Sequence, residues 1–406
     1  MLRAAQATRR QNDVLGVHET GSSISPRERI GYEMKRPLLC AFTALFVASL
    51  ACGNQAPATA FPTPEQSIFD RGRTVYGFFP SPPEPTFQGV LDHMQEIGQH
   101  ADFLLVQQNI PWEEFLAGVD GESPKRTDVR NQVVLARQNG LETIFVVDSL
   151  NGLNRREFMG LPQGWQADFA NPDVRVAFRN FTLWVVRQFS PRYLGLASEI
   201  NTYVDAHPDD FPNYLSLYRE VYAQVKAESP ETQVFVTFQW EDLNNLIPTA
   251  EEGRQPYNIN WEQVEAFEPS LDLWVISSYP FVAFPGGEAI PADYYVPLLT
   301  RTDKPLAVAE GGYTSEPVGP FLGEPQDQVD YLRAIHDQIG GRLAFWVYLL
   351  LSDFDREAYA EAMRAQGLSE SDANALGMFA SVGLRQSDGA PKPAMQVWDE
   401  YRSADR

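Results

Sequence analysis

Two glutamates end short apolar segments. In such a pair, one glutamate could act as an acid and the other as a nucleophile. Residues 194–201 read LGLASEIN, and residues 305–313 read PLAVAEGGY, so Glu199 and Glu310 each close an apolar run. A buried carboxylate is costly unless it is paired or hydrogen-bonded. Small residues precede both glutamates, which leaves space for another molecule to approach. Paired carboxylates can perform acid–base chemistry when their environments push their pKa values apart.

Glycoside hydrolysis is the reaction class that most often uses two such carboxylates. A separation of about 5–5.5 Å predicts retention of configuration and about 6.5–9.5 Å predicts inversion, and the sequence leaves both open. The five histidines show neither HxH nor HExxH spacing, and neither a G-x-S-x-G elbow nor a GxxxxGK[ST] loop occurs. We therefore expect a carbohydrate substrate, no metal and no cofactor.

Eight short β-branched or aromatic runs alternate with helical stretches after residue 70. This pattern is typical of parallel βα units, and continuous apolar runs fit strands buried on both faces. We predict a single-domain α/β fold, a (β/α)8 TIM barrel, with functional residues at the C-terminal strand ends. An open doubly wound sheet is the alternative, although no Gly-rich fingerprint follows the first run. The expected strands are 73–80, 102–108, 142–148, 193–199, 232–240, 271–280, 305–310 and 342–350; the expected helices are 86–100, 131–140, 172–190, 213–229, 292–300, 325–340 and 393–402.

Aromatic residues near the predicted strand ends could form a saccharide groove, because sugar C–H faces stack on aromatic rings. Tyr279 and Trp240 end predicted strands, Trp346 lies late in the last one, and Trp112 follows the second. Core packing is the alternative for each of them, and we favour it for Trp184 and Trp274. Further acids at strand ends are Asp148, Glu241 and Asp242.

The net charge of the 406-residue chain is −22, which opposes binding to nucleic acid or to an anionic membrane surface. We expect a monomer that meets a membrane only through a lipid anchor. The segment MKRPLLCAFTALFVASLAC (34–52) has the basic start, apolar run and small residues of a secretory signal. Its apolar part, residues 37–51, is short for a membrane span.

The cysteine that follows Ser-Leu-Ala makes the signal similar to that of a bacterial lipoprotein, with lipid on Cys52. A plain signal peptide or an uncleaved anchor is the alternative. Residues 1–33 would be a mis-called or disordered leader, 34–52 the signal, 53–70 a flexible tether and 71–406 the barrel. We expect an exported protein, lipid-anchored to a bacterial membrane in the cell envelope.

The two glutamate segments together resemble the retaining glycoside hydrolases of clan A, the 4/7 superfamily. The run DLWVISSYPF (272–281) and the SEIN segment resemble family 53 arabinogalactan endo-β-1,4-galactanases. The resemblance implies that Glu199 is the acid/base, Glu310 the nucleophile and Tyr279 its hydrogen-bonding neighbour. It also implies that Trp346 is the platform under the sugar.

The sequence departs from the clan pattern at two places. The asparagine that usually precedes the acid/base is Ser198 here, and Asn201 is a candidate substitute for its contact with the sugar 2-hydroxyl. The arginine often found near the end of the second strand is absent from DFLLVQQN (102–109), where Gln107, Gln108 or Asn109 could supply polar contacts. These departures keep two other functions open: a degenerate barrel that binds glycan without cutting it, and a cell-envelope structural protein without a sugar site.

Overall fold

The computed structural model describes residues 67–247, 254–365 and 375–405. The predicted leader, the signal with Cys52 and residues 53–66 of the tether lie outside the described residues, so these assignments stay predictions. No helix in the described part of the chain is long and apolar enough to cross a membrane.

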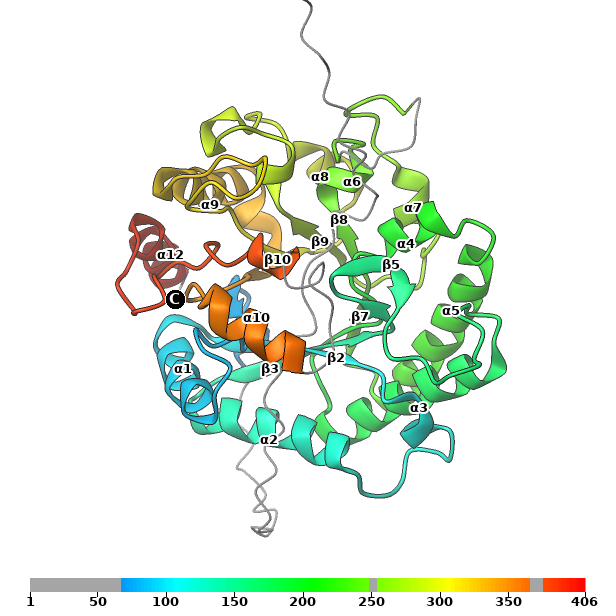
Figure 1. Ribbon diagram of the computed structural model, residues 1–406. Coiled ribbons are helices and arrows are strands. Elements are labelled where there is room, and N and C mark those ends of the chain that lie inside the picture. The colour runs from blue at the N-terminus through cyan, green and yellow to red at the C-terminus, as the bar shows by residue number, and fades with distance from the viewer. Residues whose placement is uncertain (1–66, 248–253, 366–374, 406) are drawn as a thin grey trace, which may run out of the picture. The chain divides into compact units, whose positions relative to one another are not determined.

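A closed parallel barrel forms the centre of the domain (Figure 1). The fifth strand is broken at Val236 into two segments, β7 and β8, which pair with β6 on one side and β9 on the other. The sheet therefore closes with eight strand positions, and all eight runs expected from the sequence are strands. The strands are β1 (Val75–Phe78), β2 (Phe103–Asn109), β3 (Glu142–Asp148), β6 (Tyr193–Gly195), β7 (Gln233–Phe235), β8 (Thr237–Gln239), β9 (Trp274–Ser278), β10 (Leu306–Gly311) and β11 (Leu343–Tyr348).

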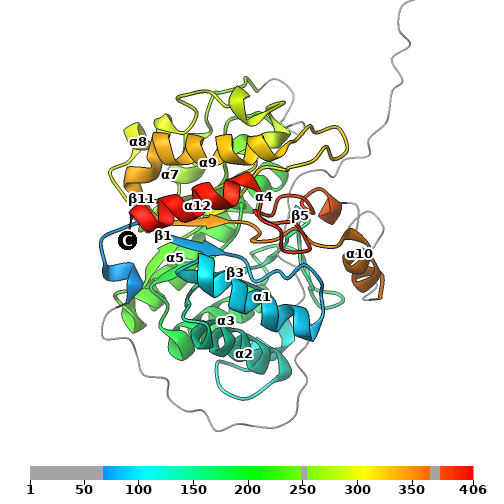
Figure 2. The same ribbon diagram turned by 90° about the vertical axis from the view of Figure 1, so that its left-hand side faces the viewer.

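Helices surround the barrel, as expected for βα units (Figures 1 and 2). Their starts follow local capping chemistry: the Asn171 side chain caps α3, whose first residue is Pro172, and Ser123 caps α2. The helices are α1 (Phe87–His100), α2 (Pro124–Gln138), α3 (Pro172–Phe189), α4 (Ile200–Ala206), α5 (Phe211–Glu228), α6 (Trp240–Leu243), α7 (Trp261–Glu265), α8 (Val296–Arg301), α9 (Pro325–Ile339), α10 (Arg356–Ala365) and α12 (Pro393–Ala404).

Aromatic rings fill the N-terminal half of the barrel interior. The Phe345 ring centroid lies 5.1 Å from Tyr193, 5.8 Å from Phe235 and 5.9 Å from Phe103. Gly77 leaves the room that these rings need, because a Cβ atom there would lie 2.5 Å from the Phe103 ring. This packed layer leaves the opposite end of the barrel for polar side chains.

Residues 67–70, which the sequence analysis assigned to the tether, belong to the barrel domain instead. They form a short helix, η1 (Ile68–Asp70), after Ser67. The Ser67 hydroxyl and the Ile68 amide donate hydrogen bonds of 2.6 and 2.7 Å to Glu142 at the start of β3. The Phe69 ring packs 5.2 Å from Tyr193. Composition alone could not show this, because the contacts are made with residues distant in sequence.

Two segments lie at the C-terminal end of the barrel (Figures 1 and 2). One is α10, and the other is a β-hairpin of β4 (Leu150–Asn151) and β5 (Asn154–Phe158). The expected strands and helices leave the stretch between residues 148 and 172 without any element, so the hairpin is a finding of the structure. A two-stranded hairpin is marginally stable alone, and this one is held by its neighbours. Trp112 Nε1 donates a 2.8 Å hydrogen bond to the Met159 carbonyl, and the Phe158 ring lies 4.7 Å from Phe169.

Candidate active site

The fold brings Glu199 and Glu310 together at the C-terminal end of the barrel. Glu310 lies on β10, while Glu199 follows β6 and precedes α4. The backbone of Glu199 has φ 49° and ψ 46°, a left-handed conformation that costs about 1–3 kcal/mol for a residue with a side chain. Its amide donates a 2.7 Å hydrogen bond to Thr237 Oγ1, which helps to hold this conformation. Strained residues of this kind cluster at functional sites.

Arg155 of the hairpin bridges the two glutamates. Its Nε donates a 3.2 Å hydrogen bond to Glu199 Oε2, and its Nη2 lies 3.8 Å from Glu310 Oε2. Nη2 also donates a 3.1 Å hydrogen bond to the Ser198 hydroxyl. Asp148, at the end of β3, forms an ion pair with Nη1. One guanidinium therefore contacts three carboxylates and the serine that precedes Glu199.

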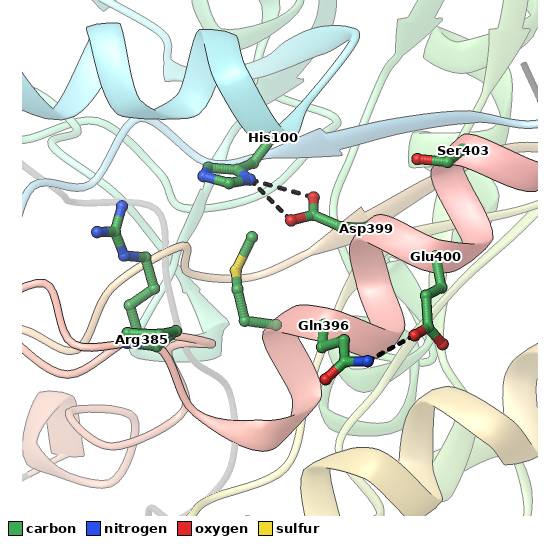
Figure 3. A pocket seen from close by; sticks show the side chains of 8 residues that line it. His100, Arg385, Gln396, Asp399, Glu400 and Ser403 are labelled. Atoms are coloured by element: carbon green, nitrogen blue, oxygen red, sulfur yellow. Dashed lines mark hydrogen bonds and ion pairs between the residues drawn. The ribbon is translucent and has the colours of Figure 1, made fainter.

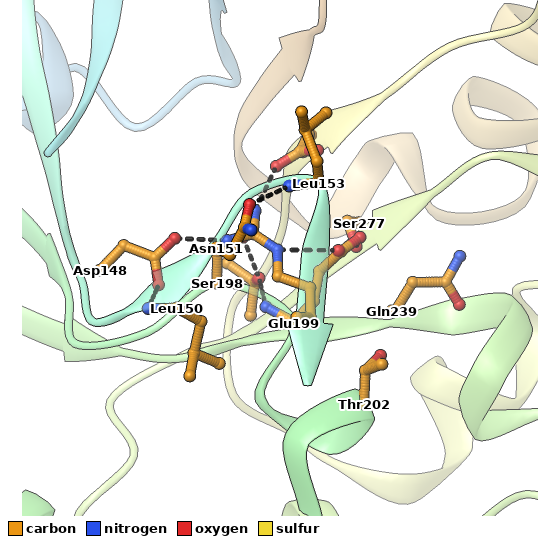
Figure 4. Close-up of polar contacts among 12 residues, drawn as sticks. Asp148, Leu150, Asn151, Leu153, Ser198, Glu199, Thr202, Gln239 and Ser277 are labelled. Carbon is orange, nitrogen blue, oxygen red and sulfur yellow. Dashed lines mark hydrogen bonds and ion pairs between the residues drawn. The ribbon is translucent and has the colours of Figure 1, made fainter. Parts of the chain in front are cut away.

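A layer of further contacts orients these groups, and Figure 4 shows Asp148, Glu199 and Ser277 among the residues involved. Gln107 Nε2 donates a 2.8 Å hydrogen bond to Asp148 Oδ2. The Ser277 hydroxyl, on β9, donates a 2.5 Å hydrogen bond to Glu199 Oε1. The Tyr279 hydroxyl donates a 2.7 Å hydrogen bond to Glu310 Oε1. The site thus draws its residues from β2, β3, β5, β9, β10 and the segment after β6.

The two glutamates are enclosed and differ in their surroundings. Glu199 and Glu310 are each only 1% exposed, and Arg155 and Asp148 are fully buried. Burial raises the pKa of Glu310 well above its ordinary value, and the charge of Glu199 raises it further. Arg155 and the Tyr279 hydrogen bond act in the opposite direction on this pKa. Within the described residues Glu310 Oε2 accepts no hydrogen bond, whereas both oxygens of Glu199 accept one.

A second buried carboxylate network lies beside the site. Glu241 accepts hydrogen bonds from Gln239 Nε2 at 2.8 Å, the Ser278 hydroxyl at 2.7 Å and the Tyr279 amide at 3.0 Å. Burial raises its pKa to about 7, although the hydrogen bonds from Ser278 and the Tyr279 amide act in the opposite direction. Because Glu241 holds the Tyr279 backbone while Tyr279 holds Glu310, this network supports the site without contacting the two glutamates that face Arg155.

The structure corrects several expected positions. Trp346 is buried on the outer side of β11, where its ring packs 5.5 Å from Trp398 of α12. Trp240 is buried against Trp261 of α7, at 6.0 Å. Neither ring lies at the cluster around Arg155. Side chains alternate between the interior and the helix layer along a strand, which turns Trp346 outward, and Trp240 is the first residue of α6.

Three other expected contacts also differ from the sequence interpretation. Gln108 points to the helix layer and donates a 3.1 Å hydrogen bond to Gln132 of α2, so its neighbour Gln107 is the one at the site. Asn201 donates hydrogen bonds to the Gln239 carbonyl and to Asp242, both at 3.1 Å, and does not replace the missing asparagine. Trp112 supports the hairpin from outside, through the Met159 carbonyl.

Arg155 and Ser277 are site residues that were not expected from the sequence. Arg155 is a buried positive charge that comes from the hairpin and not from DFLLVQQN. The available signal was the sequence NGLNRRE (151–157), shortly after the strand-end Asp148, since an Asn-Gly step between extended residues indicates a hairpin. Ser277 stands two residues before Tyr279, and that spacing places both on one face of a strand.

A separate pocket of about 540 Å³ lies on the outside of the barrel, between the end of α1 and α12 (Figure 3). His100 Nδ1 lies 3.1 Å from both carboxylate oxygens of Asp399 at its wall. The other lining residues are Arg385, Pro391, Met395, Gln396, Glu400 and Ser403. This pocket contains none of the residues around Arg155. Among the described residues, no group of three or more His, Cys, Asp or Glu side chains is arranged to hold a metal ion.

No protein-family model and no curated protein sequence matches this chain. Solved structures do match its fold. An exo-β-1,4-mannosidase from Opitutaceae bacterium strain TAV5 superposes with a TM-score of 0.58 at 12% identity, over 82% of this chain and 60% of that chain. A family 39 glycoside hydrolase from the gut symbiont Bacteroides cellulosilyticus WH2 gives 0.53 at 15% identity, over 82% and 64%. A GH5_18 variant from Bifidobacterium longum subsp. longum, in complex with Manβ1-4GlcNAc, gives 0.57 at 14% identity, over 82% and 78%.

These neighbours are glycoside hydrolases, and the likeness shows that this chain has their barrel fold. The chain spans less than two thirds of the mannosidase and of the family 39 enzyme. At these identities the fold is shared, whereas activity and substrate have to be argued from the residues of this chain.

Proposed function

We propose that this protein is a retaining glycoside hydrolase that cleaves a β-linked polysaccharide or oligosaccharide with two glutamates. One observation carries the proposal: Glu199 and Glu310 are distant in sequence, yet both contact the Arg155 guanidinium at the C-terminal end of the barrel. Tyr279, which donates a hydrogen bond to Glu310, completes the arrangement that the resemblance to clan A implies.

In this proposal Glu199 is the acid/base and Glu310 is the nucleophile. Glu199 donates a proton to the glycosidic oxygen while a Glu310 oxygen attacks the anomeric carbon, so the sugar becomes covalently bound to Glu310 and the leaving chain departs. Glu199, now ionised, takes a proton from water, and the water oxygen displaces Glu310 from the anomeric carbon. The Tyr279 hydroxyl orients Glu310 for both steps.

For the substrate we propose a β-1,4-linked glycan, and galactan is the first polymer to test because of the resemblance to family 53. Mannan is the second, because one structural neighbour is an exo-β-1,4-mannosidase and another was solved in complex with Manβ1-4GlcNAc. The test is reducing-sugar release from galactans, mannans, glucans and xylans by the wild type, Glu199→Gln and Glu310→Gln. Glu228→Gln, a surface variant, is the control.

We expect release from at least one polymer by the wild type and by Glu228→Gln. Loss of the general acid in Glu199→Gln should lower the rate by about 10²–10⁴-fold, and loss of the nucleophile in Glu310→Gln should lower it at least as much. Full activity of Glu310→Gln would refute the proposed roles.

Binding of glycan without cleavage is the second candidate, and the enclosure of the site favours it. Both glutamates are 1% exposed and bridged by Arg155, so a sugar can reach them only after the groups that cover them move. Glycan binding with no product after long incubation with the wild type would support this candidate. In that case Glu199→Gln and Glu310→Gln should leave the affinity nearly unchanged.

We also propose that the protein is exported and anchored through lipid on Cys52. The support is the sequence pattern of residues 34–52 alone. Expression of the full chain in a bacterium, with mass analysis of the mature N-terminus, tests it. A diacylated N-terminal Cys52 is the expected result, and a mature chain that starts elsewhere without lipid would contradict the proposal.

A further inference from the structure

The segment of residues 277–279, at the C-terminal end of β9, contacts both glutamates of the proposed reaction. The Ser277 hydroxyl donates a 2.5 Å hydrogen bond to Glu199 Oε1, and the Tyr279 hydroxyl donates a 2.7 Å hydrogen bond to Glu310 Oε1. Ser277 and Tyr279 are two positions apart, so their side chains lie on the same side of the chain. A displacement of this segment would therefore move the hydrogen-bond donors of both glutamates together.

Glu241, in α6, holds the same segment from its other side. It is fully buried, and its Oε2 accepts a 3.0 Å hydrogen bond from the Tyr279 amide and a 2.8 Å hydrogen bond from Gln239 Nε2. Its Oε1 accepts hydrogen bonds from the Ser278 hydroxyl at 2.7 Å and from the Tyr294 hydroxyl at 3.3 Å. Four donors therefore fix this carboxylate, and two of them belong to the segment that contacts the proposed catalytic pair.

The Tyr279 backbone needs this contact because regular strand pairing ends before it. The strand β9 pairs with β8 up to Ser277 and with β10 up to Ser278. The next amide along the chain, that of Tyr279, donates to the Glu241 carboxylate instead of to a neighbouring strand. A buried N–H group requires an acceptor. Glu241 thus fixes the chain at the point where the barrel ladder no longer does.

The two oxygens of Glu241 face different kinds of donor. Both donors to Oε2 are N–H groups, which cannot accept: the Tyr279 amide and the Gln239 side-chain amide, whose own oxygen accepts from the Asp242 backbone amide. The donors to Oε1 are hydroxyls, which can also accept. A proton or an NH2 group is therefore compatible with the Oε1 position, while Oε2 has to remain an acceptor. The hold on Tyr279 depends on where Oε2 lies and not on the charge of Glu241.

We propose that Glu241 is a positioning residue of the active site, which places Glu199 and Glu310 relative to each other by fixing residues 277–279. This inference rests on the proposed glycosidase function. In that reaction the proton donor and the nucleophile must both reach the same glycosidic bond, and a displacement of about 1 Å can cost about 100-fold in rate. Glu241 acts through the segment and takes no part in proton transfer or bond formation.

Two variants separate the position of this carboxylate from its charge. Glu241→Gln keeps the length and, with its NH2 group at the Oε1 position, keeps an acceptor for the Tyr279 amide. Glu241→Asp keeps the charge but is one methylene shorter, which withdraws the acceptor. We expect Glu241→Asp to lower kcat and kcat/KM together by about 10–100-fold, and Glu241→Gln to stay within about threefold of the wild type. Equal rates in the two variants, or the reverse order, would overturn the proposal.

A control at the other end of β9 separates this effect from a general loss of stability. Asp272 precedes the strand and accepts a 2.7 Å hydrogen bond from the Val234 amide, at the N-terminal end of the barrel. Asp272→Ala should lower the unfolding temperature and leave kcat unchanged. A loss of kcat in Asp272→Ala as large as that in Glu241→Asp would show that destabilisation alone explains the result, and would overturn the proposal.

The route of the effect is tested by a double-mutant cycle, with an aryl glycoside whose good leaving group keeps slow variants measurable. The Ser277→Ala/Tyr279→Phe background lacks both hydroxyls through which Glu241 is proposed to act. In that background the loss caused by Glu241→Asp should shrink to about twofold or less. An equal loss in both backgrounds would contradict an action through residues 277–279.

One measurement needs no substrate and keeps this inference apart from the proposed function. Amide hydrogen exchange in the peptide that contains Tyr279 should become about fivefold faster in Glu241→Asp and should keep the wild-type rate in Glu241→Gln. Unchanged exchange in Glu241→Asp would overturn the proposed hold on the segment. If the wild type cleaves no glycan, the proposed function fails, while hydrogen exchange still decides whether Glu241 fixes residues 277–279.

Discussion

The Tyr279 hydroxyl donates a 2.7 Å hydrogen bond to Glu310 Oε1, and both side chains are almost completely buried. Hydrogen bonds to charged groups contribute about 1.5–3 kcal/mol. If Glu310 becomes negative during each catalytic cycle, Tyr279→Phe should lower kcat/KM by about 10–100-fold. Tyr313→Phe is the matched control, because that hydroxyl donates to the Phe284 carbonyl instead. Equal kinetics for the two variants would show that Tyr279 does not act on Glu310.

The buried ion pair between Asp148 and Arg155 should be important for stability. Removal of one member of a buried pair leaves an uncompensated charge and costs about 3–5 kcal/mol. We expect Arg155→Met, which removes the cation from three buried carboxylates, to lower the free energy of unfolding in urea by that amount. Glu228→Gln breaks the exposed pair with Arg187 and should cost less than about 1 kcal/mol. A small loss in Arg155→Met would mean that other groups neutralise the carboxylates.

Stability should fall with rising pH because of Glu241. Its pKa is 4.5 in an ordinary environment and is raised to about 7 by burial. The folded protein therefore holds this proton more tightly than the unfolded chain, and the stabilisation is complete below about pH 4.5 and lost as pH rises to about 7. With about 1.4 kcal/mol per pKa unit, the contribution is on the order of 3 kcal/mol.

Glu241→Gln tests this directly, because glutamine can keep the contacts to Gln239, Ser278 and the Tyr279 amide without a charge. Between pH 4.5 and 7, the unfolding free energy of the variant should decrease much less than that of the wild type. It should equal or exceed the wild type in stability above that range. An unchanged slope would assign the pH dependence to other groups, of which Asp242, also raised to a pKa of about 7 by burial, is the first to examine.

The hairpin that carries Arg155 should open more often when its anchor is weakened. Trp112→Phe keeps an aromatic ring but removes the 2.8 Å hydrogen bond to the Met159 carbonyl. A neutral hydrogen bond contributes about 1 kcal/mol, so amide hydrogen exchange over 150–158 should become about fivefold faster. Trp184→Phe, on α3 and outside the hairpin, should not change it. Similar exchange rates in both variants would contradict the assigned role of Trp112.

The barrel could be predicted because its strands are continuous apolar runs separated by amphipathic helices. All eight strand positions follow from that pattern, and even the broken fifth strand lies within the expected 232–240. Glu199, Glu310 and Tyr279 could be chosen because the C-terminal ends of barrel strands are where function concentrates. No local signal shows that the fifth strand breaks at Val236, since this depends on the pairing of its two halves with different neighbours.

The remaining site residues could not be predicted for a geometric reason. Adjacent residues on a strand point to opposite sides, so a shift of one position exchanges a site residue for one in the helix layer. Gln107 contacts Asp148 while Gln108 contacts α2, and Trp346 faces α12 for the same reason. Arg155 comes from a hairpin whose path over the barrel depends on contacts with Trp112 and other residues distant from it in sequence.

The central claim is that Glu310 becomes covalently bound to the sugar. The most direct measurement is incubation with a 2-deoxy-2-fluoro glycoside that has a good leaving group, built on the sugar that the polymer panel identifies, followed by peptide mass analysis. We predict one added sugar per chain, on the peptide that contains Glu310, and no adduct in Glu310→Gln. A wild type that releases sugar from polymer yet carries the label on another residue would contradict the account.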